Sequence, residues 1–261
     1  MQRYFLHLAY QGFNYRGWQQ QPGDVRTVQG TIEDCLSRVL RQPTTVIGCG
    51  RTDAQVHASQ YVLHFNTDKA LPEDFVFILN KTLPDSISVF ECIAVPFRAH
   101  ARYDATERQY DYLIHTQKQA FLGQLSSLYE PPPIYIEAMR EAAARLPEYE
   151  DFRGYCLKPD QHNTTLCEIR HTAIYASEDG QRIRFQISAN RFLRGMVRIL
   201  VHHLVLVGQG QLTLKAFEQP LRERQPPQPL RAAYPQGLYL SRVSYPFLEL
   251  PARVDVRFER S

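Results

Sequence analysis

The pattern of apolar and polar positions predicts short strands that alternate with amphipathic helices. In the first part of the chain, one helix is expected to begin after Thr27, a typical N-cap residue, and to run to about Leu40 with one apolar face. A second helix is expected to begin at Pro72, because proline favours the first helical turn. Apolar runs predict strands over residues 3–10, 44–47, 60–65, 86–95 and 108–116.

Pro131–Pro133 is the clearest break inside the chain, and it predicts two halves, residues 1–130 and 131–261. The turn signal Glu178-Asp179-Gly180 predicts a hairpin in the second half. Because the strands form hairpins rather than a strict βαβ repeat, the pattern predicts an α+β fold with antiparallel or mixed sheets. The second half is expected to contain helices over 134–146, 192–207 and 214–222, a polar loop over 151–165, and strands over 168–176, 182–189 and 237–245.

Composition limits the class of protein. The chain has 261 residues, of which 44% are hydrophobic, and this suffices for a sizeable core in one large or two small domains. No apolar run has transmembrane length, and we expect no signal peptide before the first predicted strand. The five cysteines show no paired spacing, and the histidines show no zinc-binding motif. We therefore expect a cytoplasmic protein without a disulfide framework, a metal or a membrane contact.

Positive charge is concentrated in one part of the second half. The formal net charge is only +3, but no acidic residue lies between Asp179 and Glu218. Such a stretch creates a local positive field, which is typical of a phosphate-binding face and equally of an ordinary solvated basic face. Its cations are Arg182, Arg184, Arg191, Arg194, Arg198 and Lys215.

Asp53 is the strongest candidate for chemistry. It lies in a glycine-bounded segment between two apolar runs, and Arg51 precedes it by two residues. A carboxylate can act as a covalent nucleophile, and a nearby arginine favours its ionised form. An aspartate after a threonine near glycines is also typical of a turn or of a helix N-cap, so the residues alone leave both roles open.

The chain resembles the tRNA pseudouridine synthase A family. The segment Gly48-Cys49-Gly50-Arg51-Thr52-Asp53-Ala54-Gln55-Val56-His57-Ala58 is similar to the family pattern Gly-x-Gly-Arg-Thr-Asp-Ala-Gly-Val-His-Ala. Several ordered matches are more specific than any single one. The other matching segments are residues 10–19, 97–102, 110–112, 151–152, 189–198 and 233–240.

The resemblance implies both a fold and a reaction. It implies two similar α/β halves joined into one continuous sheet, a basic cleft between them, and a homodimer. It also implies a tRNA partner, in which the enzyme isomerises uridine to pseudouridine at positions 38 to 40 of the anticodon arm. This reaction breaks the N-glycosidic bond and rejoins the base through C5. Nothing is oxidised and no group is added, so no cofactor is needed, and the sequence carries no nucleotide-binding motif.

The resemblance also implies roles for particular residues. Asp53 would be the nucleophile, Arg51 would bind phosphate and fill the place of the extruded base, and Arg198 would pair with Asp53. Tyr110 would contact the substrate base, although Tyr112 has the same strand parity and periodicity cannot choose between them. Leu238 would line the pocket, and a plain core role for it is nearly as good an interpretation.

A shared helical face is expected for three arginines of the predicted helix over 192–207. Arg191, Arg194 and Arg198 are spaced by three and four residues, so they can form one stripe of the helix. A polar edge of a core helix explains this spacing equally well. With the resemblance, the stripe becomes a candidate substrate-binding surface.

Two departures from the family pattern keep other functions open. Gln11 replaces an aspartate, and Gln55 replaces a glycine. These changes raise the alternative of a non-catalytic tRNA-binding or tRNA-folding protein. A carboxylate-dependent nucleoside or glycoside hydrolase is a further alternative, but the motif lacks the second carboxylate that such enzymes use.

Overall fold

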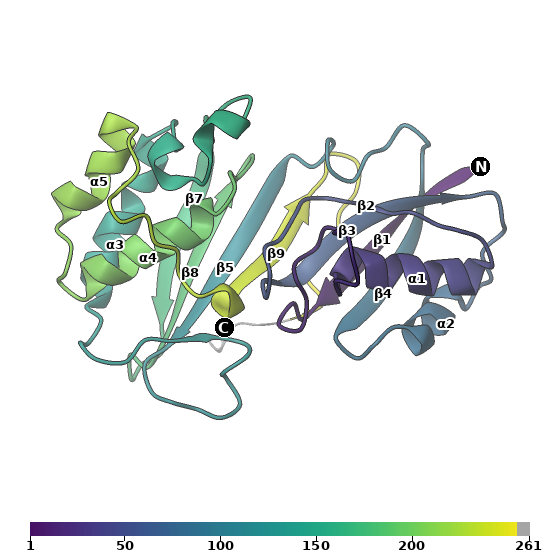
Figure 1. Ribbon diagram of the computed structural model, residues 1–261, viewed down its shortest axis with the longest axis horizontal. Helices are drawn as coiled ribbons and strands as arrows, with labels where there is room; N and C mark the ends of the chain where they lie inside the picture. The colour runs from purple at the N-terminus through teal and green to yellow at the C-terminus, as the bar shows by residue number, and fades with distance from the viewer. Residues whose placement is uncertain (255–261) are drawn as a thin grey trace. The chain divides into compact units, whose positions relative to one another are not determined.

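The computed structural model describes residues 1–254 as two compact units (Figure 1). The first unit contains Met1–Thr106 and the segment from Tyr239 to the end of the described residues, and the second contains Glu107–Leu238. This division differs from the predicted boundary at residue 130. The strand β5 (Glu107–His115) belongs to the second unit because it pairs antiparallel with β8 (Arg182–Ala189) along its length.

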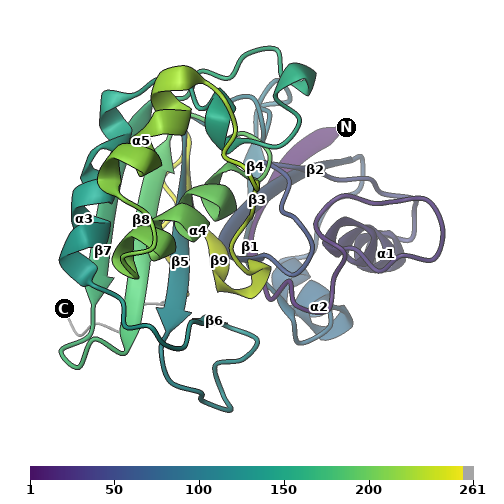
Figure 2. The same ribbon diagram turned by 60° about the vertical axis from the view of Figure 1, so that its left-hand side comes forward.

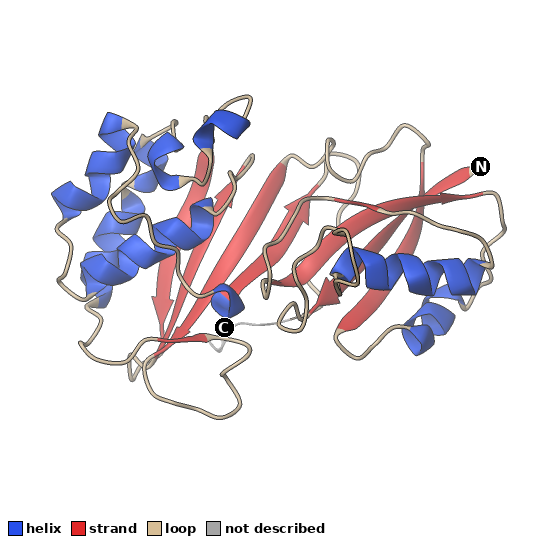
Figure 3. Ribbon diagram, in the orientation of Figure 1, coloured by secondary structure: helices blue, strands red, loops and turns tan. Residues whose placement is uncertain are grey.

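The first unit is built on β1 (Gln2–Tyr10), which pairs antiparallel with β3 (His57–Thr67) and β4 (Ile87–Val95). The last strand, β9 (Leu238–Ser244), comes from the far end of the sequence and pairs parallel with β3. The strand expected over 44–47 is reduced to β2 (Ile47–Gly48), which pairs with β3. Figure 3 distinguishes these strands from the helices.

Two helices complete the first unit. Helix α1 (Val28–Leu40) begins as the sequence predicts, because the Thr27 hydroxyl accepts a hydrogen bond from the Gly30 N–H. Helix α2 (Phe75–Thr82) begins three residues after Pro72, since a turn precedes it. The two helices pack against each other, and α2 also packs on β4 (Figures 1 and 2).

The second unit contains β5, β8 and β7 (Ile169–Ala176) as an antiparallel sheet, and the two-residue β6 (Ser127–Leu128) pairs parallel with β5. Gly180 closes the predicted β7–β8 hairpin in a left-handed conformation. Within the described residues, this unit has three helices, α3 (Ile136–Ala144), α4 (Met196–Gly208) and α5 (Leu214–Glu223). Short 3₁₀ helices cover Leu146–Glu148, Arg153–Tyr155, Pro159–Gln161 and Pro235–Gly237.

The predicted helix over residues 192–207 begins late. Gly195 has φ of 72° and precedes α4, so residues 192–194 are not helical. A Cβ at Gly195 would also lie 2.9 Å from the Leu157 side chain. The predicted stripe of Arg191, Arg194 and Arg198 on one helix is therefore wrong, because only Arg198 belongs to α4.

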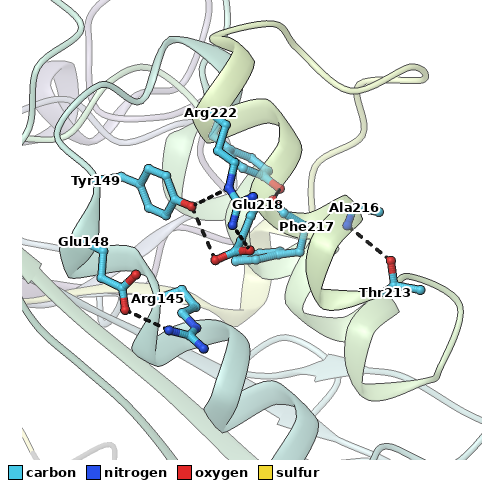
Figure 4. Close-up of polar contacts among 9 residues, drawn as sticks. Arg145, Glu148, Tyr149, Thr213, Ala216, Phe217, Glu218 and Arg222 are labelled. Atoms are coloured by element: carbon cyan, nitrogen blue, oxygen red, sulfur yellow. Dashed lines mark hydrogen bonds and ion pairs between the residues drawn. The ribbon is translucent and has the colours of Figure 1, made fainter.

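Helix α5 is fixed to the rest of the second unit by a buried carboxylate (Figure 4). Glu218 accepts a hydrogen bond of 3.3 Å from the Tyr149 hydroxyl and forms an ion pair of 2.7 Å with Arg222. The Thr213 hydroxyl caps the helix by accepting from the Ala216 N–H. Burial of a charge is tolerated here because the carboxylate is both paired and hydrogen-bonded.

The α+β class, with antiparallel and mixed strand pairing in two halves, is confirmed by these units. Within residues 1–254, each helix is too short or too polar to cross a membrane.

Candidate active site

Asp53 lies in the loop that joins β2 to β3, in the first unit. Its side chain is half-buried, whereas Arg51 is exposed and Thr52 is buried. A carboxylate in this position can reach a substrate and still have a fixed backbone. The loop therefore has the exposure that a nucleophile needs.

Aromatic side chains form the base of this loop. The Tyr10 and Thr52 hydroxyls are 2.9 Å apart, and the Tyr61 hydroxyl donates to the Gly50 carbonyl at 2.6 Å. Trp18 stacks on Tyr61 with ring centroids 4.1 Å apart. These contacts hold the residues on the N-terminal side of Asp53 in one conformation.

Two glycines let the segment over residues 11–18 pass directly behind the Asp53 loop. A Cβ at Gly12 would lie 1.9 Å from the Val56 carbonyl oxygen, and a Cβ at Gly17 would lie 2.7 Å from the Thr52 carbonyl oxygen. Gly17 also has φ of 100°, which favours glycine. The Trp18 N–H donates to the Thr52 carbonyl at 3.1 Å. No larger residue fits either position without moving the loop.

On the C-terminal side of Asp53, a tight turn is closed by the Val56 N–H, which donates to the Asp53 carbonyl at 3.2 Å. Gln55 is the third residue of this turn and has φ of 65°. Its N–H donates to the Tyr15 carbonyl at 3.1 Å. A left-handed conformation costs a residue other than glycine about 1–2 kcal/mol. The contacts of the turn therefore maintain a strained glutamine two residues from Asp53.

Arg198 is oriented by a backbone carbonyl of the second unit. Its Nε donates to the Ala233 carbonyl at 2.8 Å, and its own carbonyl accepts from the Ala233 N–H at 2.8 Å. The residue lies in the first turn of α4, at the positive end of the helix dipole, where a cation is unfavourable by about 0.3–1 kcal/mol. Helix stability therefore does not explain an arginine at this position.

The structure distinguishes the two tyrosines of β5 that the sequence could not. Tyr112 is 0% exposed, and its hydroxyl donates to the Tyr234 carbonyl at 2.8 Å and accepts from the Ser127 hydroxyl at 2.9 Å. Burial raises the pKa of Tyr112 well above its usual value, although the charge of Arg198 opposes this shift. Tyr110 is half-buried and contacts Phe192 edge to face at 5.0 Å. Tyr112 is thus a core residue, and Tyr110 is the better candidate for contact with a base.

The remaining candidate residues of the second unit are Arg191, Arg194 and Leu238. Arg191 is half-buried and Arg194 is exposed; in the sequence they precede and follow Phe192, whose ring contacts Tyr110. Leu238 is buried at the start of β9, directly after Gly237. The structure thus brings Tyr110 and the segment over residues 190–195 together, and it places Arg51 with Asp53 in the first unit.

Comparison with known proteins decides the family. The tRNA pseudouridine synthase family model matches residues 8–104 and 142–246. The chain belongs to this family. A tRNA pseudouridine synthase A of Parabacteroides distasonis is 38% identical over 250 residues, which cover 94% of this chain and 97% of that protein. The tRNA pseudouridine synthase A of Bacteroides thetaiotaomicron is 41% identical over 251 residues, which cover 94% of this chain and 91% of that protein. The tRNA pseudouridine synthase A of Gloeobacter violaceus is 38% identical over 247 residues, which cover 94% of this chain and 80% of that protein.

Membership in the tRNA pseudouridine synthase family confirms the predicted resemblance and the reaction class. The chain is an isomerase that acts on uridines of tRNA. This reaction moves a base within one nucleotide and leaves the atoms of the substrate unchanged in number.

Reasoning from the sequence alone missed the residues that support the loop of this pseudouridine synthase. The pattern of residues 10–19 matches the family motif but indicates no role for Gly12, Gly17 or Tyr10. The two glycines in a short aromatic segment were the available signal. Their function becomes visible only when the Asp53 loop is seen against them.

Replacing Gln55 by glycine is expected to relieve the backbone strain of the turn. We expect Gln55→Gly to retain catalysis and to change the relative use of target uridines, because it removes an amide side chain beside Asp53. Sequencing of pseudouridine positions in tRNA treated with each enzyme checks this. An identical site profile in both would make the glutamine neutral, whereas an inactive wild type that Gln55→Gly activates would favour a non-catalytic protein.

Proposed function

We propose that this chain converts uridine to pseudouridine at positions 38 to 40 of the tRNA anticodon arm, with Asp53 as the covalent nucleophile. The observation that carries the proposal is the setting of Asp53. It is a half-buried carboxylate in a loop that is fixed by a hydrogen bond from Tyr61 and by close packing of the segment over residues 11–18. Such fixation positions a reacting group before the substrate arrives.

The proposed reaction is balanced without a cofactor. Asp53 forms a covalent bond to either the ribose or the uracil ring, and the bond between N1 and the ribose C1′ breaks. The detached base turns, and its C5 forms the new bond to C1′. C5 then loses its proton, and N1, which carries none in uridine, gains one. The bond to Asp53 breaks and frees its carboxylate, either at C1′ as C5 bonds there or at the ring carbon that Asp53 attacked.

Other residues are proposed to act on the substrate around this step. A target inside an RNA arm must be turned out of its stack before it can react. Arg51, exposed two residues from Asp53, binds phosphate and occupies the place of the extruded base. Tyr110 stacks on the uracil and relays a proton, with Leu238 lining the pocket. Arg191 and Arg194 bind the RNA backbone through charge-assisted hydrogen bonds.

Arg198 is proposed as the cation that keeps the nucleophile ionised. Its guanidinium is directed by the Ala233 carbonyl, and its place at the start of α4 is not favoured by the helix dipole. We further propose that the protein is a cytoplasmic homodimer. It acts on tRNA without a metal or cofactor.

One observation favours a second candidate function. The strained Gln55 stands in the turn beside Asp53, and a displaced turn would leave a protein that binds tRNA without modifying it. The remainder of the loop matches the family pattern residue by residue, so we retain catalysis as the first proposal.

Mapping of pseudouridine in tRNA tests the proposal. We expect cells that lack this protein to lose pseudouridine at positions 38 to 40, and the purified enzyme to restore it on an unmodified transcript. Loss at other positions would overturn the proposed target. An unchanged modification pattern, together with tight tRNA binding by the purified protein, would support the non-catalytic alternative.

A further inference from the structure

A cluster of aromatic and basic side chains lies on the first unit, outside the proposed site. The cluster, here called the Tyr103 patch, surrounds the loop that follows β4. Phe97 is 57% exposed and Tyr103 is 75% exposed, and Arg98 and Arg102 are exposed beside them. The complete patch consists of Arg3, Phe97, Arg98, His100, Arg102 and Tyr103.

The side chains of the patch are held in place by one another. The guanidinium of Arg3 lies over the Phe97 ring, 4.8 Å from its centroid, and donates to the Ala99 carbonyl at 2.8 Å. Tyr103 stacks on His100 with centroids 4.2 Å apart. Arg102 lies 5.8 Å from the centroid of the Tyr103 ring. The result is two contact groups, Arg3 with Phe97 and Tyr103 with His100 and Arg102, on one short segment of chain.

Hydrogen bonds fix the loop beneath the exposed rings. The Nδ1 atom of His100 accepts from the Arg102 N–H at 3.1 Å and from the Tyr103 N–H at 3.2 Å. Asp104 accepts from the His100 N–H at 2.8 Å. Burial lowers the pKa of His100, and the charge of Arg3 lowers it further, although Asp104 opposes them. The ring is therefore a neutral acceptor at pH 7, and the loop has a defined shape.

The position of the patch separates it from Asp53 along the strand. Arg3 pairs with Asn66 near one end of β1, whereas Tyr10 pairs with Ala58 near the end that leads to the Asp53 loop. Seven residues of extended chain span about 24 Å. The patch is therefore too far from Asp53 to contact the reacting uridine.

We propose that the Tyr103 patch binds a second segment of the tRNA, with an unstacked base on the Tyr103 ring and phosphates on Arg98 and Arg102. Surfaces that bind single-stranded nucleic acid combine rings, on which bases stack, with cations along the backbone. Arg3, Arg98 and Arg102 give this loop the positive charge that binding of a polyanion requires. The choice of tRNA as the occupant rests on the proposed function.

The test compares variants of the exposed residues in the full-length enzyme with unmodified tRNA. Tyr103→Ala is expected to weaken the Kd for tRNA by about 5- to 10-fold, in line with the loss of one stacked base, while Tyr103→Phe retains it. Arg98→Gln is expected to reduce the slope of log Kd against log salt by about 1, because one phosphate contact is lost. The turnover at saturating tRNA should stay unchanged in all three variants.

A second exposed pair on the same unit supplies the matched control. Lys81 lies over the exposed Phe77 ring on α2, 5.4 Å from its centroid, but no further arginine–ring pair adjoins it among the described contacts. Phe77→Ala and Lys81→Gln should therefore bind tRNA as the wild type does. Thermal melting of every variant shows whether the fold is intact.

Three results would overturn the proposal. The first is a wild-type Kd and salt slope in both Tyr103→Ala and Arg98→Gln. The second is an equal loss of affinity in Phe77→Ala. The third is a changed oligomeric state in Tyr103→Ala with unchanged tRNA affinity, which would assign the patch to a contact between copies of the chain. The readout of this test is tRNA binding, which does not depend on catalysis. If the wild-type protein binds tRNA but forms no pseudouridine, the proposed function is wrong, and the variants still show whether the patch binds tRNA.

Discussion

Asp53→Asn is expected to abolish pseudouridine formation while leaving the fold and tRNA binding intact. The amide has the size and shape of the carboxylate but cannot form the covalent bond that the proposed reaction requires. Removal of a covalent nucleophile typically costs more than about 10³-fold in turnover. The measurement is single-turnover formation of pseudouridine on an unmodified tRNA transcript, alongside the Kd for the same RNA.

The structure offers a matched control for this substitution. Asp68 is an exposed aspartate of the same unit, directly after β3, and Asp68→Asn should retain full turnover. Asp53→Glu keeps the charge but moves it by one methylene, so we expect it to be nearly as inactive as Asp53→Asn. Substantial turnover in purified Asp53→Asn would remove Asp53 from the role of nucleophile, whatever the fate of the other residues.

Local signals predicted the elements that local interactions determine. Helix α1 begins after Thr27 because one hydroxyl caps it, and the β7–β8 hairpin closes at Gly180 because glycine accepts a left-handed conformation. Both features depend on residues that are neighbours in the sequence. For the same reason, the position of Asp53 on a short loop between strands was predictable from the pattern around it.

Elements that depend on distant contacts were predicted less well. The segment over residues 192–194 has helical spacing, but the left-handed Gly195, packed against Leu157, makes α4 begin later. The strand β5 falls before the proline break, yet it belongs with the second unit because its partner β8 lies far along the chain. Hydrophobic periodicity carries no information about such pairings.

The same limit applies to the site. Tyr110 and Tyr112 are equivalent in the pattern, and only the buried hydroxyl contacts of Tyr112 separate them. The close approach of Gly12 and Gly17 to the Asp53 loop joins segments about forty residues apart, which no local signal reports. Gln55 departed from the family pattern in the sequence, but its left-handed conformation had to be observed.

Arg198→Met is expected to reduce turnover by about 10²- to 10³-fold, the usual cost of removing one electrostatic group from a reacting centre. Methionine keeps the helix propensity and much of the volume of arginine while removing its charge. Because a cation in the first turn of α4 opposes the helix dipole, its loss should not destabilise the helix. The lost hydrogen bond to the Ala233 carbonyl is expected to cost only about 1 kcal/mol of unfolding free energy.

Two further substitutions separate the charge of Arg198 from its other contributions. Arg198→Lys keeps the charge without the Nε contact to Ala233, so partial recovery of turnover relative to Arg198→Met would identify the charge as the active property. Lys215→Met removes one positive charge from an exposed position on α5 and should leave turnover near the wild-type value. The decisive measurement is the single-turnover rate at saturating tRNA, because a residue that only bound RNA would change the Kd instead. If Arg198→Met and Lys215→Met both react at the wild-type rate, Arg198 is a structural residue that joins α4 to the Ala233 backbone, and the nucleophile is kept ionised by other means.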